Sequence, residues 1–156
     1  MVDKKDLKPF DLRKYPIVPL VGVGVLLTRD DSLLLVRRKF DPDAGYWAIP
    51  GGHLDLGERV EIATEREALE ETGFRVKVTQ LAGIIDKIMY DEKGQIEYHY
   101  VLLNYFVEQI EGDQNQLPLA QDDALDARFV PFSEIKNYNL TKSLIELLKQ
   151  LKIGYP

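Results

Sequence analysis

Three carboxylates stand close together in the stretch REALEETG, residues 66–73. Glu67, Glu70 and Glu71 have the spacing i, i+3 and i+4, which places them on one face of a helix. Acids at this spacing repel one another, and the last turn of a helix favours cations instead. Carboxylate oxygens without a nearby histidine or cysteine suit a hard cation such as Mg²⁺ or Mn²⁺. The octet therefore predicts a metal-binding face, with a plain solvated acidic face as the alternative.

The neighbours of the triplet favour the metal-binding interpretation. Val60 and Ala63 continue the same helical face and are apolar, so water would screen the repulsion between the carboxylates less well. Arg66 lies one turn before Glu70 and is placed to hold that carboxylate through paired hydrogen bonds. We therefore expect Arg66 to orient the Glu70 carboxylate.

The whole chain has 156 residues, a net charge of −6 and no cysteine. This length fits a single domain over residues 1–156, with residues 1–15 as an N-terminal extension. The lack of cysteine excludes a disulfide framework, a zinc–thiolate site and a thiol nucleophile. The negative charge argues against a nucleic-acid partner, and no apolar run approaches the roughly 20 residues of a membrane span. The start MVDKKDLKPF lacks the apolar core of a secretory signal, so we expect a cytoplasmic protein without a membrane partner.

Hydrophobic patterning and turn residues predict the elements that carry the acids. The expected strands are 19–28, 33–38, 46–49, 75–89, 95–107 and 127–130, and the expected helices are 59–72 and 141–151. Polar turns at 29–32 and 91–94 predict two hairpins, and Gly73 supplies a left-handed helix cap. Strands on both sides of a central helix, followed by a last helix, indicate the α+β class or a mixed α/β sandwich.

The acidic octet is part of a longer pattern that begins with GGHLDLGE. Seven residues of fixed type follow one another at fixed spacing: Gly52, Glu58, Arg66, Glu67, Glu70, Glu71 and Gly73. An independent chance match is on the order of 10⁻⁸ per starting position. Residues 52–74 resemble the Nudix box of the Nudix hydrolases, and the region 36–58 is most similar to ADP-ribose pyrophosphatase-like members. Ala68 and Phe74 depart slightly from the family pattern, at apolar packing positions that carry no chemistry.

The resemblance implies a Nudix-type α/β/α sandwich with a mixed β-sheet, and it implies roles for residues of the box. Glu67, Glu70 and Glu71 would hold Mg²⁺ or Mn²⁺, with the backbone carbonyl of Gly51 as a further ligand. Glu67, Glu71 and Arg66 are then the catalytic residues of the box. Glu58 has two interpretations, a metal contact or a helix cap or salt bridge.

Family members often add an acid from a later loop, as a metal ligand or general base. The stretch QDDALDARFVP offers Asp122, Asp123 and Asp126. Asp123 precedes Phe129 by six residues, which resembles the spacing in some relatives, so we count Asp123 among the catalytic candidates. The alternatives are an ordinary polar loop, with Glu67 as the general base.

Substrate contacts are expected from residues outside the acidic octet. Arg37 and Arg38 end a strand, and their planar guanidinium groups match phosphate oxygens. Because side chains alternate along a strand, at most one of the two points into a cleft. His53 faces the substrate or caps its loop, and Tyr98 stacks on a base or, like most aromatic residues in strands, packs in the core.

Three functions compete on this sequence. The first is divalent-metal-dependent hydrolysis of the pyrophosphate linkage of a nucleoside diphosphate derivative, ADP-ribose or a related nucleotide sugar. The second is the same chemistry on a nucleoside triphosphate, including oxidised ones. The third is a non-catalytic Nudix-fold sensor of a nucleotide ligand, which has no need of the intact glutamate set. In each case the partner is a small nucleotide. The resemblance also implies that the protein could form a homodimer.

Overall fold

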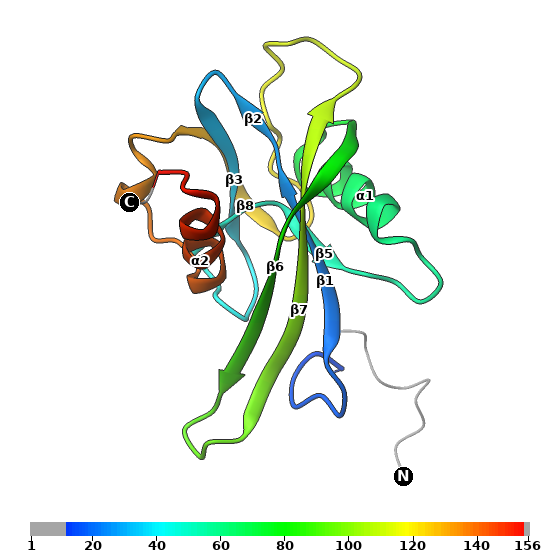
Figure 1. Ribbon diagram of the computed structural model, residues 1–156, viewed down its shortest axis with the longest axis vertical. Coiled ribbons are helices and arrows are strands. Elements are labelled where there is room, and N and C mark those ends of the chain that lie inside the picture. The colour runs from blue at the N-terminus through cyan, green and yellow to red at the C-terminus, as the bar shows by residue number, and fades with distance from the viewer. Residues whose placement is uncertain (1–11, 155–156) are drawn as a thin grey trace.

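The computed structural model describes residues 12–154, so residues 1–11 of the predicted N-terminal extension lie outside the described part. Figure 1 shows how the strands and helices are arranged. In chain order the elements are β1 (Leu20–Leu26), β2 (Thr28–Arg29), β3 (Ser32–Arg38), β4 (Trp47–Ala48), β5 (Gly51–His53), α1 (Val60–Thr72), β6 (Val76–Tyr90), β7 (Ile96–Gln109), β8 (Ala124–Pro131), the short 3-10 helix η1 (Ile135–Asn137) and α2 (Lys142–Leu151).

One sheet is mixed and has the strand order β5-β1-β7-β6. β1 runs parallel to β7 and antiparallel to β5, while β6 and β7 form the long antiparallel hairpin of Figure 1. The sequence did not predict β5, because Pro50-Gly51-Gly52 reads as a turn. A Cβ on Gly51 would lie 2.1 Å from the carbonyl oxygen of Val23. Glycine therefore lets this short strand approach β1 closely.

The second sheet is centred on β3, which pairs antiparallel with β2, β4 and β8. The turn before β3 is tighter than predicted, because Asp30 and Asp31 alone form it, with φ of 46° and 59°. Two residues with positive φ match the twist of a hairpin. The predicted strand 19–28 is divided, so that β1 belongs to the first sheet and β2 opens the second.

α1 forms where the sequence is rich in Glu and contains neither Gly nor Pro. It ends at the predicted left-handed Gly73, which has φ of 77° and donates its N–H to the Leu69 carbonyl at 2.9 Å. Ala68 and Phe74 are fully buried against Val25 of β1. The two departures from the family pattern are therefore core positions, as expected.

α2 begins after Thr141, whose hydroxyl accepts the Leu144 N–H at 3.3 Å. Leu144, Leu147 and Leu148 are buried in a cluster that includes Ile85 of β6. α1 and α2 thus lie on opposite sides of the mixed sheet (Figure 1), which confirms the predicted α+β sandwich. In the described range 12–154, no helix has the length and apolar character needed to cross a membrane.

Candidate active site

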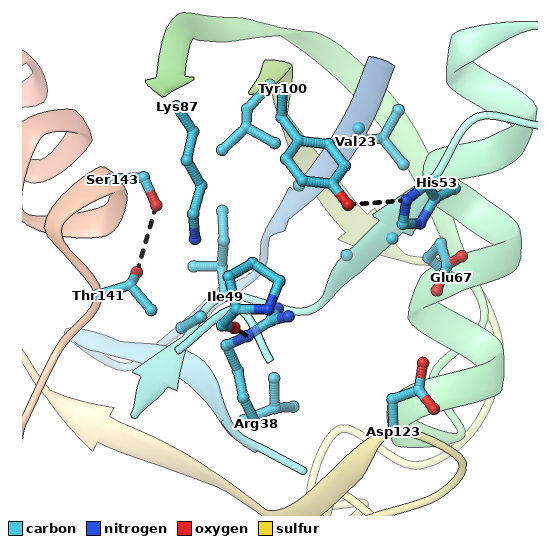
Figure 2. Close-up of a pocket in the computed structure, with 18 of the residues that line it drawn as sticks. Val23, Arg38, Ile49, His53, Glu67, Lys87, Tyr100, Asp123, Thr141 and Ser143 are labelled. Carbon is cyan, nitrogen blue, oxygen red and sulfur yellow. Dashed lines mark hydrogen bonds between the residues drawn. The ribbon is translucent and has the colours of Figure 1, made fainter. Parts of the chain in front are cut away.

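A cleft of about 250 Å³ opens beside α1, with walls from both sheets and from α2. Figure 2 shows Glu67 and Asp123 at one end of the cleft, and Lys87, Thr141 and Ser143 at the other. One end is therefore acidic, and the opposite end carries an ammonium group and two hydroxyl groups.

Glu71 contributes the most deeply buried carboxylate of the cleft. Its side chain lines the cleft, the residue is only 7% exposed, and its Oε2 accepts the Gly51 N–H at 3.1 Å. Burial raises the pKa of Glu71 to about 8; the charges of Glu67 and Asp123 add to this rise, against the Gly51 hydrogen bond and Arg38. A cation in the cleft would relieve this unfavourable burial of charge.

The Glu67 carboxylate lines the cleft and lies directly beside the backbone of Gly52. A Cβ on Gly52 would lie 2.3 Å from Oε1 of Glu67, so any other residue at position 52 would displace this carboxylate. Burial raises the pKa of Glu67, and its hydrogen bond with Arg66 acts in the opposite direction. Gly51 and Gly52 therefore have separate uses: the first approaches β1 and bonds Glu71, and the second leaves room for Glu67.

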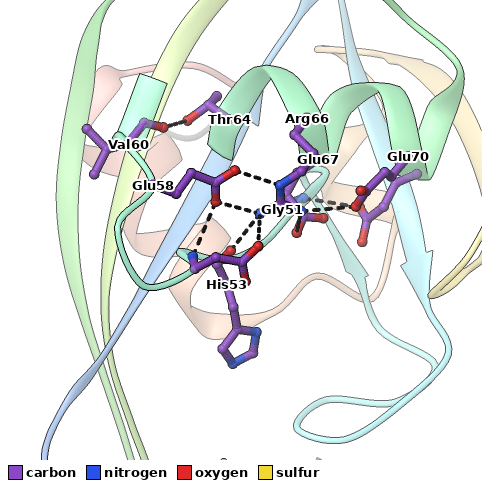
Figure 3. Close-up of polar contacts among 10 residues, drawn as sticks. Gly51, His53, Glu58, Val60, Thr64, Arg66, Glu67 and Glu70 are labelled. Atoms are coloured by element: carbon purple, nitrogen blue, oxygen red, sulfur yellow. Dashed lines mark hydrogen bonds and ion pairs between the residues drawn. The ribbon is translucent and has the colours of Figure 1, made fainter. Parts of the chain in front are cut away.

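Arg66 forms hydrogen bonds with three glutamates of residues 52–74, as Figure 3 shows. Its Nε and Nη2 donate to the two oxygens of Glu58 at 2.8 and 2.9 Å, and its Nη1 donates to Glu67 at 2.9 Å and to Glu70 at 3.0 Å. The Arg66 guanidinium lowers the pKa of Glu58. Arg59, and not Glu58, occupies the cap position of α1. Of the two interpretations of Glu58, the geometry agrees with the salt bridge.

The three glutamates of the octet do not all reach the cleft. Glu67 and Glu71 line it together with Gly51, whereas Glu70 is exposed and pairs with Arg66. In the described chain, no group of three His, Asp or Glu side chains is arranged to hold a metal ion. Glu67, Glu71 and the Gly51 carbonyl still fit a hard cation, because they offer only oxygens and Glu71 is buried. A cation there would bind Glu67 alongside Arg66, or would replace Arg66 as the partner of this carboxylate.

Asp123 comes from the connection between β7 and β8 and lines the same cleft. Its carbonyl oxygen accepts the Lys39 N–H at 2.9 Å, which fixes the chain beside the end of β3. Asp126, in contrast, forms an ion pair with Arg128, and neither Asp122 nor Asp126 lines the cleft. The structure therefore singles out Asp123 among the three aspartates of this segment.

Of the two arginines that end β3, only Arg38 lines the cleft. Arg37 is exposed and donates from Nε to the Gly45 carbonyl at 3.1 Å. The two side chains therefore have different surroundings, and only Arg38 is placed to meet a ligand in the cleft. His53 also lines the cleft, and burial, with the charges of Arg13 and Arg38, lowers the pKa of His53 to about 4. The imidazole is therefore neutral at pH 7.

Tyr98 is buried and does not line the cleft, whereas Tyr100, two residues further along β7, does. The hydroxyl of Tyr100 and Nε2 of His53 lie 3.1 Å apart, and the two rings pack edge to face. Both tyrosines point to the same side of β7, so alternation along the strand does not favour one over the other.

Lys87 is a cleft residue that was not predicted from the sequence. It lines the cleft at the same end as Thr141 and Ser143 and forms an ion pair with Asp43. Burial lowers the pKa of Lys87, and the Asp43 carboxylate opposes this change. The one signal in the sequence is that Lys87 lies two residues after Ile85, a core residue of the same strand, and therefore points to the same side of the sheet.

Known proteins resemble this chain over most of its length. The family model of the NUDIX domain matches residues 18–151. The ADP-ribose pyrophosphatase of Methanocaldococcus jannaschii is 35% identical over 134 residues, which cover 85% of this chain and 75% of that protein.

Two solved structures extend the comparison to the fold. The crystal structure of a MutT NUDIX hydrolase from Burkholderia pseudomallei has a TM-score of 0.71 and 29% identity, and the match covers 86% of this chain and 98% of that one. A bifunctional NMN adenylyltransferase/ADP ribose pyrophosphatase from Francisella tularensis, complexed with AMP and a manganese ion, has a TM-score of 0.63 and 25% identity. That match covers 86% of this chain and 41% of the larger one.

Proposed function

The chain belongs to the NUDIX domain family and is a hydrolase of phosphoanhydride bonds, and we propose that its substrate is ADP-ribose or a related nucleotide sugar. The single observation that carries the proposal is the cleft that joins Glu67, Glu71 and Asp123 to the cationic Arg38. Extensive similarity to an ADP-ribose pyrophosphatase supports the choice of substrate.

Glu67, Glu71 and the backbone carbonyl of Gly51 would hold a divalent cation, Mg²⁺ or Mn²⁺, with Glu70 able to join from the rim of the cleft. When bound, such a cation screens the phosphate charge and makes a coordinated water more acidic. The buried Glu71 and the manganese ion of the Francisella tularensis relative support this assignment. Arg66 would keep Glu67 oriented through its anchor on Glu58.

Hydrolysis needs a base beside the attacking water. The oxygen of water forms a bond to one phosphorus, the bridging P–O bond breaks, and the proton of water passes to a carboxylate. Asp123 is our candidate for that carboxylate, because it faces the cleft from a separate segment and no ion pair of Asp123 is present among residues 12–154. Glu67 is the alternative base.

The phosphates and the nucleoside would meet the remaining cleft residues. Arg38 offers a planar fork to phosphate oxygens, and His53 with Tyr100 offers a neutral polar pair beside it. Arg37 and Tyr98 were also predicted to contact the substrate, but neither lines the cleft. A single domain over residues 1–156, a cytoplasmic location and a homodimer remain predictions.

A substrate panel tests the proposal. The full chain with Mg²⁺ is incubated with ADP-ribose, other nucleotide sugars, nucleoside triphosphates and oxidised nucleoside triphosphates, and chromatography resolves the products. We expect AMP and ribose 5-phosphate from ADP-ribose, at the highest kcat/KM of the panel. A preference for triphosphates, with pyrophosphate as product, would replace the proposed substrate. Binding of ADP-ribose without turnover of any compound would support the sensor instead.

A further inference from the structure

The connection between β7 and β8, residues 110–123, is attached to the C-terminal end of α1. The Gln121 N–H donates to the Glu71 carbonyl at 3.0 Å, and the Leu119 N–H donates to the Thr72 carbonyl at 3.0 Å. The side-chain amide of Gln116 donates to the Gly73 carbonyl at 3.3 Å. Carbonyls at the end of a helix lack partners within the helix and carry its negative partial charge. One segment thus satisfies three consecutive carbonyls, the last two of α1 and that of its cap Gly73.

Arg29 of β2 holds the middle of this connection. Its Nη1 donates to the Gln116 carbonyl at 2.7 Å, and its Nη2 donates to Oε1 of Gln109 at 2.9 Å. Its guanidinium carbon lies 4.3 Å from the ring centre of Phe129 and 5.3 Å from that of Phe74. A planar group that stacks and donates in two directions is specific to arginine.

The far end of the connection carries Asp123. Gln121, which is bonded to the Glu71 backbone, is only two residues from Asp123, and the Asp123 carbonyl accepts the Lys39 N–H. The Asp123 carboxylate therefore faces Glu67 and Glu71 because the same segment is tied to α1 and to β3. Long connections without such ties sample many conformations.

From these contacts we infer that Arg29, which does not line the cleft, is a positioning residue that sets the place of Asp123. It acts by holding residues 109–123 against the C-terminal end of α1. The catalytic consequence rests on the proposed function, in which Asp123 receives the proton of the attacking water. The structural part of the inference does not depend on the proposed function.

Amide hydrogen exchange tests the structural part without any substrate. In Arg29→Met, we expect the amides of Leu119, Gln121 and Lys39 to exchange at least tenfold faster than in the wild type. Arg75→Met is the matched control, because Arg75 also contacts this segment, through an exposed ion pair with Glu111 at 3.3 Å. Arg29→Lys keeps the charge but loses the fork, and it serves if Arg29→Met does not fold. Unchanged protection of the three amides in the folded Arg29 variant would overturn the inference.

Turnover tests the catalytic part in a double-mutant cycle with Asp123→Asn. We expect Arg29→Met to lower kcat about tenfold with KM within a few-fold, and to cause no further loss in the Asp123→Asn background. Equal losses in both backgrounds would mean that Arg29 acts on stability or another group, which contradicts the inference. If the wild type hydrolyses no compound of the panel, the proposed function fails, and the exchange experiment alone decides the role of Arg29.

Discussion

Arg66 binds Glu58 through two parallel hydrogen bonds, from Nε to Oε2 at 2.8 Å and from Nη2 to Oε1 at 2.9 Å. This pair leaves Nη1 of Arg66 to donate to Glu67 and Glu70. Both Nη groups are thereby fixed in direction, because the guanidinium is planar. Glu58, which does not line the cleft, thus holds the same guanidinium that contacts Glu67.

Replacement of Arg66 by lysine should separate this orienting role from simple charge balance. A lysine keeps the positive charge but cannot hold Glu58 in a fork and reach Glu67 at the same time. We expect Arg66→Lys to lower kcat/KM by about 10- to 100-fold, the usual size of an effect on ligand orientation. Glu58→Gln keeps a single hydrogen bond and should lose less. Wild-type kcat/KM in Arg66→Lys would show that charge alone is sufficient.

Removal of divalent cations should abolish turnover. If Glu67 and Glu71 hold a cation, excess EDTA removes it and leaves two carboxylates facing the phosphates. Addition of Mg²⁺ or Mn²⁺ in excess of the chelator should restore the rate. The same additions should raise the melting temperature, because a cation that binds only the folded chain stabilises it. Full activity in excess chelator would contradict the metal-dependent mechanism.

Glu71→Gln tests whether the buried carboxylate is a metal ligand. The side chains are nearly isosteric, and the glutamine oxygen can still accept the Gly51 N–H. We expect a loss of at least 10²-fold in kcat, about 2.7 kcal/mol of transition-state stabilisation. Glu70→Gln, on the exposed rim, is the matched control and should lose less. Near-normal kcat in Glu71→Gln would restore the solvated acidic face as the better interpretation.

The metal-free chain should lose stability as the pH rises. Glu71 has a pKa of about 8 in the folded chain against 4.5 for the ordinary group. Between these values the folded state binds more protons than the unfolded state, so the free energy of unfolding falls with rising pH. The contribution is complete below about pH 4.5 and is lost as the pH passes 8. Chemical denaturation at pH 5 and pH 9 without metal should differ by on the order of a few kcal/mol from this group.

Two comparisons isolate Glu71 in that measurement. Glu71→Gln has no carboxyl at this position, so its stability should depend less on pH. In the wild type at pH 9, Mg²⁺ should recover part of the loss, because it binds the ionised carboxylate. The prediction would be contradicted if the free energy of unfolding changed by the same amount between pH 5 and pH 9 in the wild type and in Glu71→Gln.

The part of the cleft that one helix carries could be predicted from the sequence. Spacing along α1 placed Glu67 and Glu71 on one face, and both line the cleft. The same reasoning included Glu70, which lies on the exposed rim. Three residues at i, i+3 and i+4 span a face that is wider than the cleft, so spacing alone does not tell which of them points inward.

The residues at the opposite end of the cleft could not be predicted in the same way. Lys87 belongs to β6, where the pairing with β7 shifts register between Val78 and Gln80 and again between Leu81 and Gly83. Each irregularity changes the side of the sheet to which the following residues point. Thr141 reaches the cleft because α2 packs on this sheet, which is a contact between distant parts of the chain.

Asp123→Asn should lower kcat by about 10²-fold or more while leaving substrate affinity within a few-fold, because a base acts mainly in the transition state. The acidic limb of the pH–rate profile, which is set by ionisation of the base, should disappear in this variant. Asp122→Asn is the matched control, because Asp122 directly precedes Asp123 and does not line the cleft. Asparagine also tolerates the φ of 49° at position 122. Asp126→Asn removes only the ion pair with Arg128. If the three variants behave alike, or if Asp123→Asn keeps the wild-type rate across the pH range, residues 110–123 are a polar connection and Glu67 becomes the preferred base.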